Sequence, residues 1–164
     1  MGTKINTLRQ QTSSNGILLT SWLEKSGFSR SEVSKYMKSE WLQRIYTGVY
    51  QFTGDTPSLY GILASYQKQA GLKYHIGAAS AWLNDAELDM NLVEVSSKVL
   101  GSGGIEQMDY QGQTLTVSSP ERAIMECILL SPSRYDLMDV YYLMEMLTSL
   151  RASLIQRLLE DCTS

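Results

Sequence analysis

The sequence predicts an α+β protein in two parts, residues 1–54 and residues 55–164. Apolar residues recur at helical spacing in several segments, and short alternating runs joined by glycine indicate hairpins. The charge also changes sign along the chain. Residues 1–54 carry seven basic and three acidic side chains, a net charge of +4, whereas residues 55–164 carry seven basic and fourteen acidic ones, a net charge of −7. This split suggests that the first part meets a polyanion.

The first part begins with a predicted helix over residues 4–11, whose apolar side holds Ile5 and Leu8. Polar residues 12–16 end it, and the apolar run 17–19 is too short for a helix and suits a strand. A second helix follows over residues 21–26. We expect Thr20 to be its N-cap and Gly27 to form the left-handed turn after it.

The third predicted helix begins at a capping box, in which Ser29 and Glu32 satisfy each other's backbone amides, and it continues to Glu40. Projected at 100° per residue, one side of this helix holds Val33, Tyr36, Met37 and the terminal Glu40. The opposite arc of about 100° contains no carboxylate. Its members are Ser31, Ser34, Lys35 and Lys38.

Ammonium and small hydroxyl groups on one helix face are the chemistry that contacts phosphates and base edges in a major groove. Arg30 flanks this face in the first turn and could contact a phosphate or a guanine. The alternative is a merely solvated face, but such a face usually mixes charges of both signs. The sequence therefore predicts a DNA-recognition helix.

A hairpin follows, with strands over residues 43–46 and 49–52 joined at Thr47 and Gly48. Because Thr47 is β-branched and resists a positive φ, we expect a type I turn with a bulge at Gly48 and not a type I′ turn. Helix, strand, helix, helix, hairpin is the order of a winged helix-turn-helix. In that fold the third helix enters the major groove, and Arg44 and Thr47 lie on the wing near the backbone or the minor groove.

The second part is predicted to be a mixed α/β domain with a small antiparallel sheet and C-terminal helices. Helices are expected over residues 57–70, 78–83, 119–130, 137–149 and 151–161, a strand over 92–95, and a hairpin over 105–110 and 113–117. The helix over 137–149 is rich in methionine and apolar on more than one face. A helix of that composition either packs in the core or binds in a groove of a partner protein.

Catalytic and metal-binding chemistry is not expected. The only histidine, His75, has no nucleophile and acid spaced near it, and the two cysteines, Cys127 and Cys162, are expected to be free thiols. The Gly-rich run 101–104 lacks the Lys-Ser/Thr of a phosphate loop. We therefore expect no enzyme activity, no metal and no cofactor. Neither a signal peptide nor an apolar run of about 20 residues is present, so a cytoplasmic protein without membrane contact is expected.

Three segments together resemble the AbiEi-type antitoxins of type IV toxin–antitoxin systems, in the branch with a separate N-terminal DNA-binding domain. They are residues 19–50 (LTSWLEKSGFSRSEVSKYMKSEWLQRIYTGVY), 74–83 (YHIGAASAWL) and 117–130 (VSSPERAIMECILL). The family pattern has more residues between the YHIG helix and a strand near Asp89, and it continues past Ser164. We therefore expect residues 55–164 to be a short or incomplete form of the antitoxin domain.

The resemblance implies a cytoplasmic transcriptional regulator that represses its own operon by binding inverted repeats in the promoter. It further implies an antitoxin that counters a nucleotidyltransferase toxin in a phage-resistance locus, with direct contact between the two proteins left open. Carried over by position, the residues that would meet DNA are Ser31, Ser34, Lys35, Lys38 and Arg44. The alternative hypothesis is a protein-interaction module whose winged helix does not bind specific DNA sequences. An enzyme is the weakest hypothesis.

Overall fold

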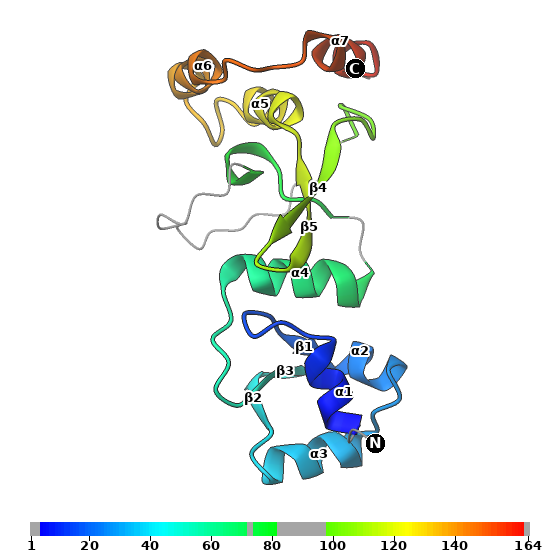
Figure 1. Cartoon of the computed structure of the whole chain (residues 1–164). Coiled ribbons are helices and arrows are strands. Elements are labelled where there is room, and N and C mark those ends of the chain that lie inside the picture. The colour runs from blue at the N-terminus through cyan, green and yellow to red at the C-terminus, as the bar shows by residue number, and fades with distance from the viewer. Residues whose placement is uncertain (1–3, 72–73, 82–97, 163–164) are drawn as a thin grey trace. The chain divides into compact units, whose positions relative to one another are not determined.

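A computed structural model describes residues 4–71, 74–81 and 98–162 (Figure 1). The chain forms two compact units. Unit 1 comprises Met1–Tyr74 together with Met108–Leu115, and unit 2 comprises His75–Gln107 and Thr116–Ser164. Helices and two small antiparallel sheets confirm the predicted α+β class. The strand expected over residues 92–95 lies outside the described residues, and the domain boundary expected after residue 54 stays a prediction.

Unit 1 has the element order of a winged helix-turn-helix, and its three-stranded sheet has the strand order β1-β3-β2 with both pairs antiparallel. A fourth helix follows the wing. The elements are α1 (Lys4–Gln10), β1 (Leu18–Leu19), α2 (Thr20–Lys25), α3 (Arg30–Lys38), β2 (Leu42–Tyr46), β3 (Val49–Phe52) and α4 (Leu59–Ala70).

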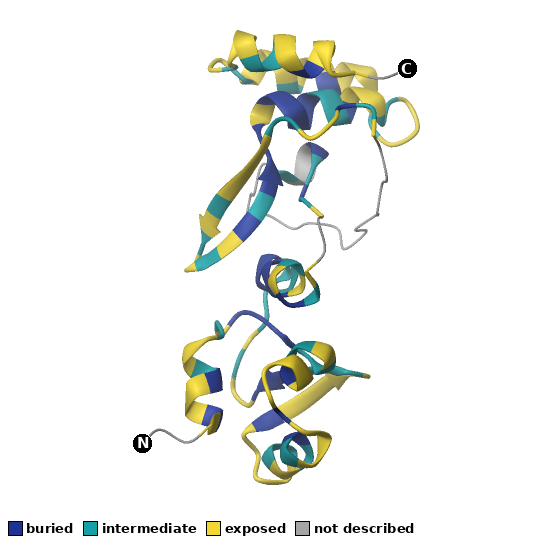
Figure 2. Ribbon diagram, turned by 90° about the vertical axis from the view of Figure 1, so that its right-hand side faces the viewer, coloured by how far each residue is buried: buried dark blue, intermediate teal, exposed yellow. Residues whose placement is uncertain are grey.

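The core of unit 1 is made by the apolar sides of α1, α2 and α3 packed on the sheet (Figure 2). Fully burying one leucine or phenylalanine side chain stabilises a fold by roughly 1.5–3 kcal/mol, so this cluster contributes substantially to the stability of the unit. The buried members are Ile5, Leu8, Leu18, Leu23, Phe28, Val33, Leu42 and Phe52.

Helix α4 supplies hydrogen bonds to the free edge of β1. The Gln69 amide accepts from the Leu19 N–H at 2.7 Å and donates to the Ile17 carbonyl at 2.6 Å, while the Ser65 hydroxyl accepts from the Ile17 N–H at 3.0 Å. A buried strand edge without such partners would leave costly unpaired polar groups. Gly61 permits the approach, because a Cβ atom there would meet the Asn15 carbonyl oxygen.

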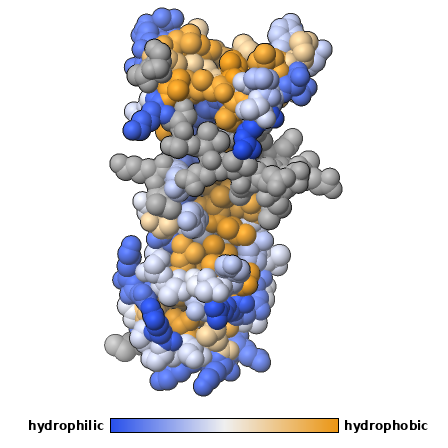
Figure 3. All heavy atoms as spheres, turned by 180° about the vertical axis from the view of Figure 1, so that it is seen from behind, coloured by the Kyte–Doolittle hydropathy of each residue, from blue (hydrophilic) through white to orange (hydrophobic). Residues whose placement is uncertain are grey.

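Unit 2 is organised around one helix that contacts a short 3-10 helix and the two C-terminal helices. Its cluster of buried residues is Ala78, Ile124, Cys127 and Val140. Hydrophobic side chains also gather on the surface over the C-terminal helices (Figure 3). The elements after α4 are η1 (Ala78–Ala81), β4 (Ile105–Tyr110), β5 (Gln113–Ser118), α5 (Pro120–Leu129), α6 (Leu137–Met146) and α7 (Ala152–Glu160), of which the tip of the β4–β5 hairpin, Met108–Leu115, belongs to unit 1.

Several predicted helix ends were wrong. Thr20 lies inside α2 and does not cap it; its hydroxyl instead donates to the Gly48 carbonyl at 3.0 Å, and Leu19 occupies the N-cap position. Helix α4 begins after Pro57, because the Ser58 hydroxyl caps it by accepting from the Gly61 N–H at 3.1 Å.

Three further expectations need correction. Helix α3 ends before Glu40, which has a φ of 58° and is exposed, so it is not part of the inward side. Helix α6 ends at Met146, where Leu147 leaves helical geometry with a ψ of 80°. The segment that starts at Ala78 is a 3-10 helix as far as Ala81, and residues 82–83 of the expected helix lie outside the described part of the chain.

Candidate nucleic-acid interface

The predicted capping box at the start of α3 is confirmed. The Ser29 hydroxyl accepts from the Glu32 N–H at 3.2 Å, and the Glu32 carboxylate accepts from the Ser29 N–H at 2.7 Å. Lys4 of α1 also donates to Glu32 at 2.7 Å. The hydrogen bonds from Lys4 and then from Ser29 lower the pKa of Glu32 to about 2. The only carboxylate of α3 is therefore fully engaged inside the unit.

One side of α3 faces the core and the other faces solvent, as the sequence pattern predicts. Val33 is buried, and Tyr36 and Met37 pack against the core of unit 1. On the opposite side Ser31, Lys35 and Lys38 are exposed, and Ser34 is half-buried. In Figure 2, α3 is the lowest helix of the view and carries buried, intermediate and exposed residues.

The ammonium groups of Lys35 and Lys38 form no ion pair with any side chain in the described part of the chain. An uncompensated positive charge on an exposed helix face attracts counterions, which a polyanion can displace. Two such charges one turn apart are spaced to meet neighbouring phosphates. We call Ser31, Ser34, Lys35 and Lys38 the basic face of α3; Ser34 is half-buried and the other three are exposed.

Arg30 is placed differently from the two lysines. Its side chain is 86% exposed, and its Nε donates to the Glu24 carboxylate of α2 at 2.9 Å. This hydrogen bond and the charge of Glu24 raise the pKa of Arg30. Nothing in the local sequence pattern indicated this partner, because the contact joins two helices across a turn. The positive charge of Arg30 is thus partly compensated in the free protein.

The wing is the hairpin of β2 and β3. Gly48 has a φ of 78° whereas Thr47 does not have a positive φ, so the turn is not type I′, as expected. The bulge lies elsewhere than predicted: Arg44 pairs with Tyr50 and Tyr46 with Val49, which leaves Ile45 as the extra residue.

Two contacts hold the wing turn in place. The Gly48 carbonyl accepts from both the backbone N–H and the hydroxyl of Thr20, at 2.9 and 3.0 Å. Arg44 Nε donates to the Tyr46 carbonyl at 3.3 Å. Arg44 and Thr47, the two wing residues predicted to contact DNA, are both exposed.

A depression of about 250 Å³ lies between α2, α3 and the wing. Arg30, Val33 and Met37 of α3 line one side of it, and Gly48 and Tyr50 of the wing line another. The first turns of α3 and the wing turn therefore border one concave surface. This is the arrangement in which a recognition helix and a wing can contact the same stretch of duplex.

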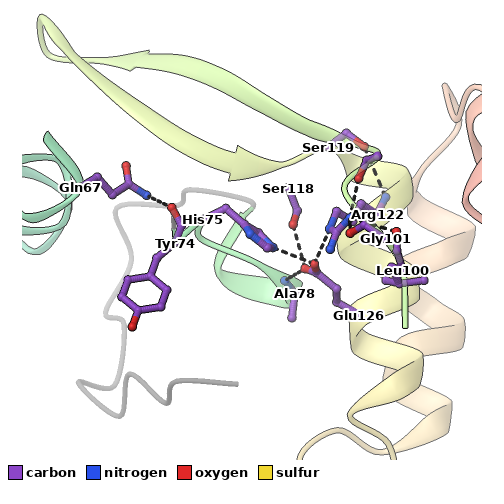
Figure 4. A network of polar contacts seen from close by, with 11 residues as sticks. Gln67, Tyr74, His75, Ala78, Leu100, Gly101, Ser118, Ser119, Arg122 and Glu126 are labelled. Atoms are coloured by element: carbon purple, nitrogen blue, oxygen red, sulfur yellow. Dashed lines mark hydrogen bonds and ion pairs between the residues drawn. The ribbon is translucent and has the colours of Figure 1, made fainter. Parts of the chain in front are cut away.

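A second polar cluster, in unit 2, was not predicted from the sequence (Figure 4). Arg122 of α5 is 4% exposed. Its Nη1 donates to the carbonyls of Leu100 at 3.3 Å, Gly101 at 3.1 Å and Gly103 at 2.5 Å, and its Nε donates to Glu126 at 2.7 Å. The guanidinium thus ties the glycine-rich loop to α5. A buried arginine paired in this way is typical of a structural role.

Glu126 is the centre of this cluster. Its carboxylate accepts from the Ala78 N–H at 2.8 Å and the Ser118 hydroxyl at 2.8 Å, and it lies 2.9 Å from Nε2 of His75. Burial raises the pKa of Glu126, but the hydrogen bonds from His75, Ala78, Ser118 and Arg122 outweigh it and bring the pKa to about 2. His75 therefore has a structural partner, as expected for a histidine without a nucleophile nearby.

Glu121 lies in residues 118–122 (SSPER), the segment that leads into α5 and also holds Arg122, and it anchors the start of α7. It is 1% exposed and accepts from the Arg151 N–H at 2.8 Å and from its guanidinium at 2.8 and 3.0 Å. The hydrogen bonds from Arg151 lower the pKa of Glu121 to about 2, although burial opposes the shift. Ser119 caps α5 by accepting from the Arg122 N–H. The segment is therefore structural.

Within the described residues, no group of three or more His, Cys, Asp or Glu side chains is arranged to hold a metal ion. Over those same residues, none of the helices has both the length and the apolar character needed to cross a bilayer.

Comparison with known families identifies both halves of the chain. The family described as the N-terminal domain of AbiEi antitoxin transcriptional regulators matches residues 1–90. The family described as the AbiEi antitoxin of type IV toxin–antitoxin systems, also a transcriptional regulator, matches residues 63–164. A search of curated proteins found no match. The two family matches together span the whole sequence.

The buried cluster predicts a pH-dependent stability. Because the pKa of Glu126 lies below its unfolded value near 4.5, the ionised form stabilises the fold above that pH, and this contribution is lost as the pH falls towards 2. Replacing Glu126 with glutamine should therefore reduce stability at pH 7 and flatten its decline between pH 5 and 2.

Urea unfolding at pH 7, 5 and 3 measures this difference. Glu160→Gln is the matched control, because Glu160 is exposed on α7 and its carboxylate accepts from the Gln156 amide at 2.8 Å. A parallel loss of stability in the wild type and in Glu126→Gln as the pH falls would show that the cluster does not depend on this charge.

Proposed function

Because the chain belongs to the AbiEi family of type IV antitoxins, whose members are transcriptional regulators, we propose that it is a DNA-binding autorepressor and the antitoxin of a nucleotidyltransferase toxin. The family is a class of regulators and not a class of enzymes. One observation carries the DNA-binding proposal: the basic face of α3 is exposed, free of carboxylates and opposite the side that packs on the core.

The chemistry of this face supports binding in a major groove. The Lys35 and Lys38 ammonium groups contact phosphates, and the Ser31 and Ser34 hydroxyls reach base edges or phosphates nearby. The capping box holds the first turn of the helix in place, where recognition helices make most of their base contacts. The repulsive carboxylate of Glu32 is neutralised by Lys4.

The wing extends the contact. Arg44 and Thr47 are exposed at the hairpin, and Arg30 lies across the depression from the wing turn. With α3 in the major groove, the wing meets the backbone or the adjacent minor groove. The target is double-stranded promoter DNA in the cytoplasm. Inverted repeats in it would bind two copies at half-sites about one helical turn, roughly 34–36 Å, or a multiple of that apart.

A second candidate function, protein interaction, is favoured by α6. Tyr141 and Tyr142 are 50% and 54% exposed, and Met146 is 78% exposed. The helix carries Asp139 and Glu145 but no lysine or arginine. The other exposed apolar residues of α6 are Leu137, Met138 and Met144. This surface is complementary to a protein with an apolar groove bordered by basic side chains, and we propose the toxin as that protein.

The main test uses the full chain and a labelled duplex carrying its own promoter. The double variant Lys35→Ala/Lys38→Ala should bind more weakly to all sequences, and the slope of log affinity against log salt should fall by about 2. Fluorescence anisotropy at several salt concentrations measures both quantities. Lys68→Ala, an exposed lysine on α4, is the control. Unchanged affinity in the double variant would remove the basic face from the DNA site.

Glu24 should act as an internal competitor of DNA for Arg30. Glu24→Gln releases the guanidinium, so we expect tighter DNA binding and a salt slope steeper by about 1. The same titrations, repeated in an Arg30→Ala background, test whether the gain passes through Arg30. A gain that persists without Arg30 would show that removing the charge of Glu24 acts generally and not through the ion pair.

Calorimetric titration of the chain with the purified nucleotidyltransferase encoded beside it tests the second candidate. Tyr142→Glu, which places a carboxylate on the exposed apolar surface of α6, should weaken the complex by at least about tenfold. The Lys35→Ala/Lys38→Ala variant should bind the toxin normally. Absence of a complex with the wild type would dismiss this candidate and mean that the toxin is countered without contact.

A further inference from the structure

The wing carries an aromatic side chain that is largely exposed to solvent. Tyr46, the last residue of β2, is 75% exposed. The neighbouring tyrosines of unit 1 behave differently: Tyr50 packs against the core, and Tyr36 packs against the core and lies 6.2 Å from the Phe28 ring. A large ring that stays in water at the end of a hairpin buries little apolar surface and so contributes little to the stability of the fold. Such exposed aromatic residues at a binding surface commonly contact a partner.

The strand register shows how Tyr46 reaches this position. Directly paired residues share a face of the sheet, so Arg44 lies on the face of Tyr50, and Tyr46 lies on the opposite face with Val49. In a regular strand, Arg44 and Tyr46 would share one face. The bulge at Ile45 therefore turns Tyr46 away from the side of the sheet that packs on the core. Bulges next to binding sites commonly redirect a side chain in this way.

The backbone under Tyr46 is held firmly. Arg44 Nε donates to the Tyr46 carbonyl at 3.3 Å, and two residues later the Gly48 carbonyl accepts from the N–H and the hydroxyl of Thr20. Because these hydrogen bonds already restrain the backbone that carries the ring, binding costs little additional conformational freedom. Arg44, on the other face of the same strand, adds positive charge to the wing, which favours its approach to the DNA backbone.

We propose that Tyr46 contacts DNA, with its ring packed against the sugar edges of the minor groove beside the segment bound by α3. This inference rests on the proposed DNA-binding function and adds an apolar, uncharged contribution to it. Side chains inserted there sense the width of the groove and the absence of the guanine amino group, so the contact favours A·T pairs. Pairing of the β2 edge with a second copy is disfavoured by the bulge and by Arg44.

The experiment compares Tyr46→Ser, Tyr46→Phe and the control Tyr66→Ser in the full chain, bound to the promoter duplex over a range of salt concentrations. Tyr66 is an exposed tyrosine on α4, 43% accessible. Tyr46→Ser should weaken binding by about tenfold at every salt concentration and leave the salt slope unchanged, because no phosphate contact is lost. Tyr46→Phe should bind almost as the wild type does, since the ring carries the contact.

Base substitution provides a second measurement. Replacing A·T pairs under the wing with I·C pairs keeps the minor-groove pattern, because inosine lacks the amino group of guanine, whereas G·C pairs change it. The wild type should tolerate I·C and discriminate against G·C, and Tyr46→Ser should lose this discrimination. Circular dichroism and thermal unfolding of each variant verify that the fold is intact.

The outcomes separate this inference from the proposed function. If the wild type does not bind the promoter, the proposed function itself fails. If it binds and Tyr46→Ser binds equally well, with unchanged discrimination, only the role of Tyr46 is overturned. If sedimentation shows that Tyr46→Ser converts a dimer to a monomer, and the weaker binding follows from that change alone, Tyr46 belongs to an interface between copies and the inference is also overturned.

Discussion

The contact of α3 with the core of unit 1 determines how this protein can meet DNA. Val33 is buried, and Tyr36 and Met37 pack on the same cluster, so the helix cannot rotate about its axis without exposing them. The capping box at Ser29 sets where the helix begins. Together these contacts define which side chains face solvent. The exposed position of the basic face is therefore a consequence of core packing and not a separate feature of the surface.

Much of the fold could be predicted because it follows from local patterns. Helical periodicity placed α3 and α7 within a residue or two of their ends, and the capping box was visible in Ser29 and Glu32. The errors have a common origin in contacts between distant segments. Thr20 resembles an N-cap, but the Gly48 carbonyl takes its hydroxyl. The bulge lies at Ile45 and not at the glycine, because pairing along the whole hairpin sets the register.

The polar clusters show the same distinction. Arg122 and Glu126 are four residues apart on one helix, a spacing that could have suggested an ion pair from sequence. Ser118 is a further partner from 8 residues away, whereas His75 and the carbonyls of the glycine-rich loop come from 19 to 51 residues away. No local pattern identifies such partners. The pair of Glu24 and Arg30 is only six residues apart, but it joins two different helices, so helical spacing did not indicate it although it changes the electrostatics of the candidate site directly.

A net charge of −3 and a sequence pI near 5.2 do not conflict with DNA binding, because two acidic side chains near the basic face, Glu24 and Glu32, are already paired with basic groups. Glu32 is paired with Lys4, and Asp55 with Arg9. In unit 2, Glu121 and Glu126 are likewise paired with arginines. Paired charges produce little field at a distance, and at physiological salt the remaining ones are screened beyond about 8 Å. A phosphate approaching α3 therefore responds mainly to Lys35 and Lys38, which have no such partners among the described residues. What governs association is the local arrangement of unpaired charge and not the sign of the total.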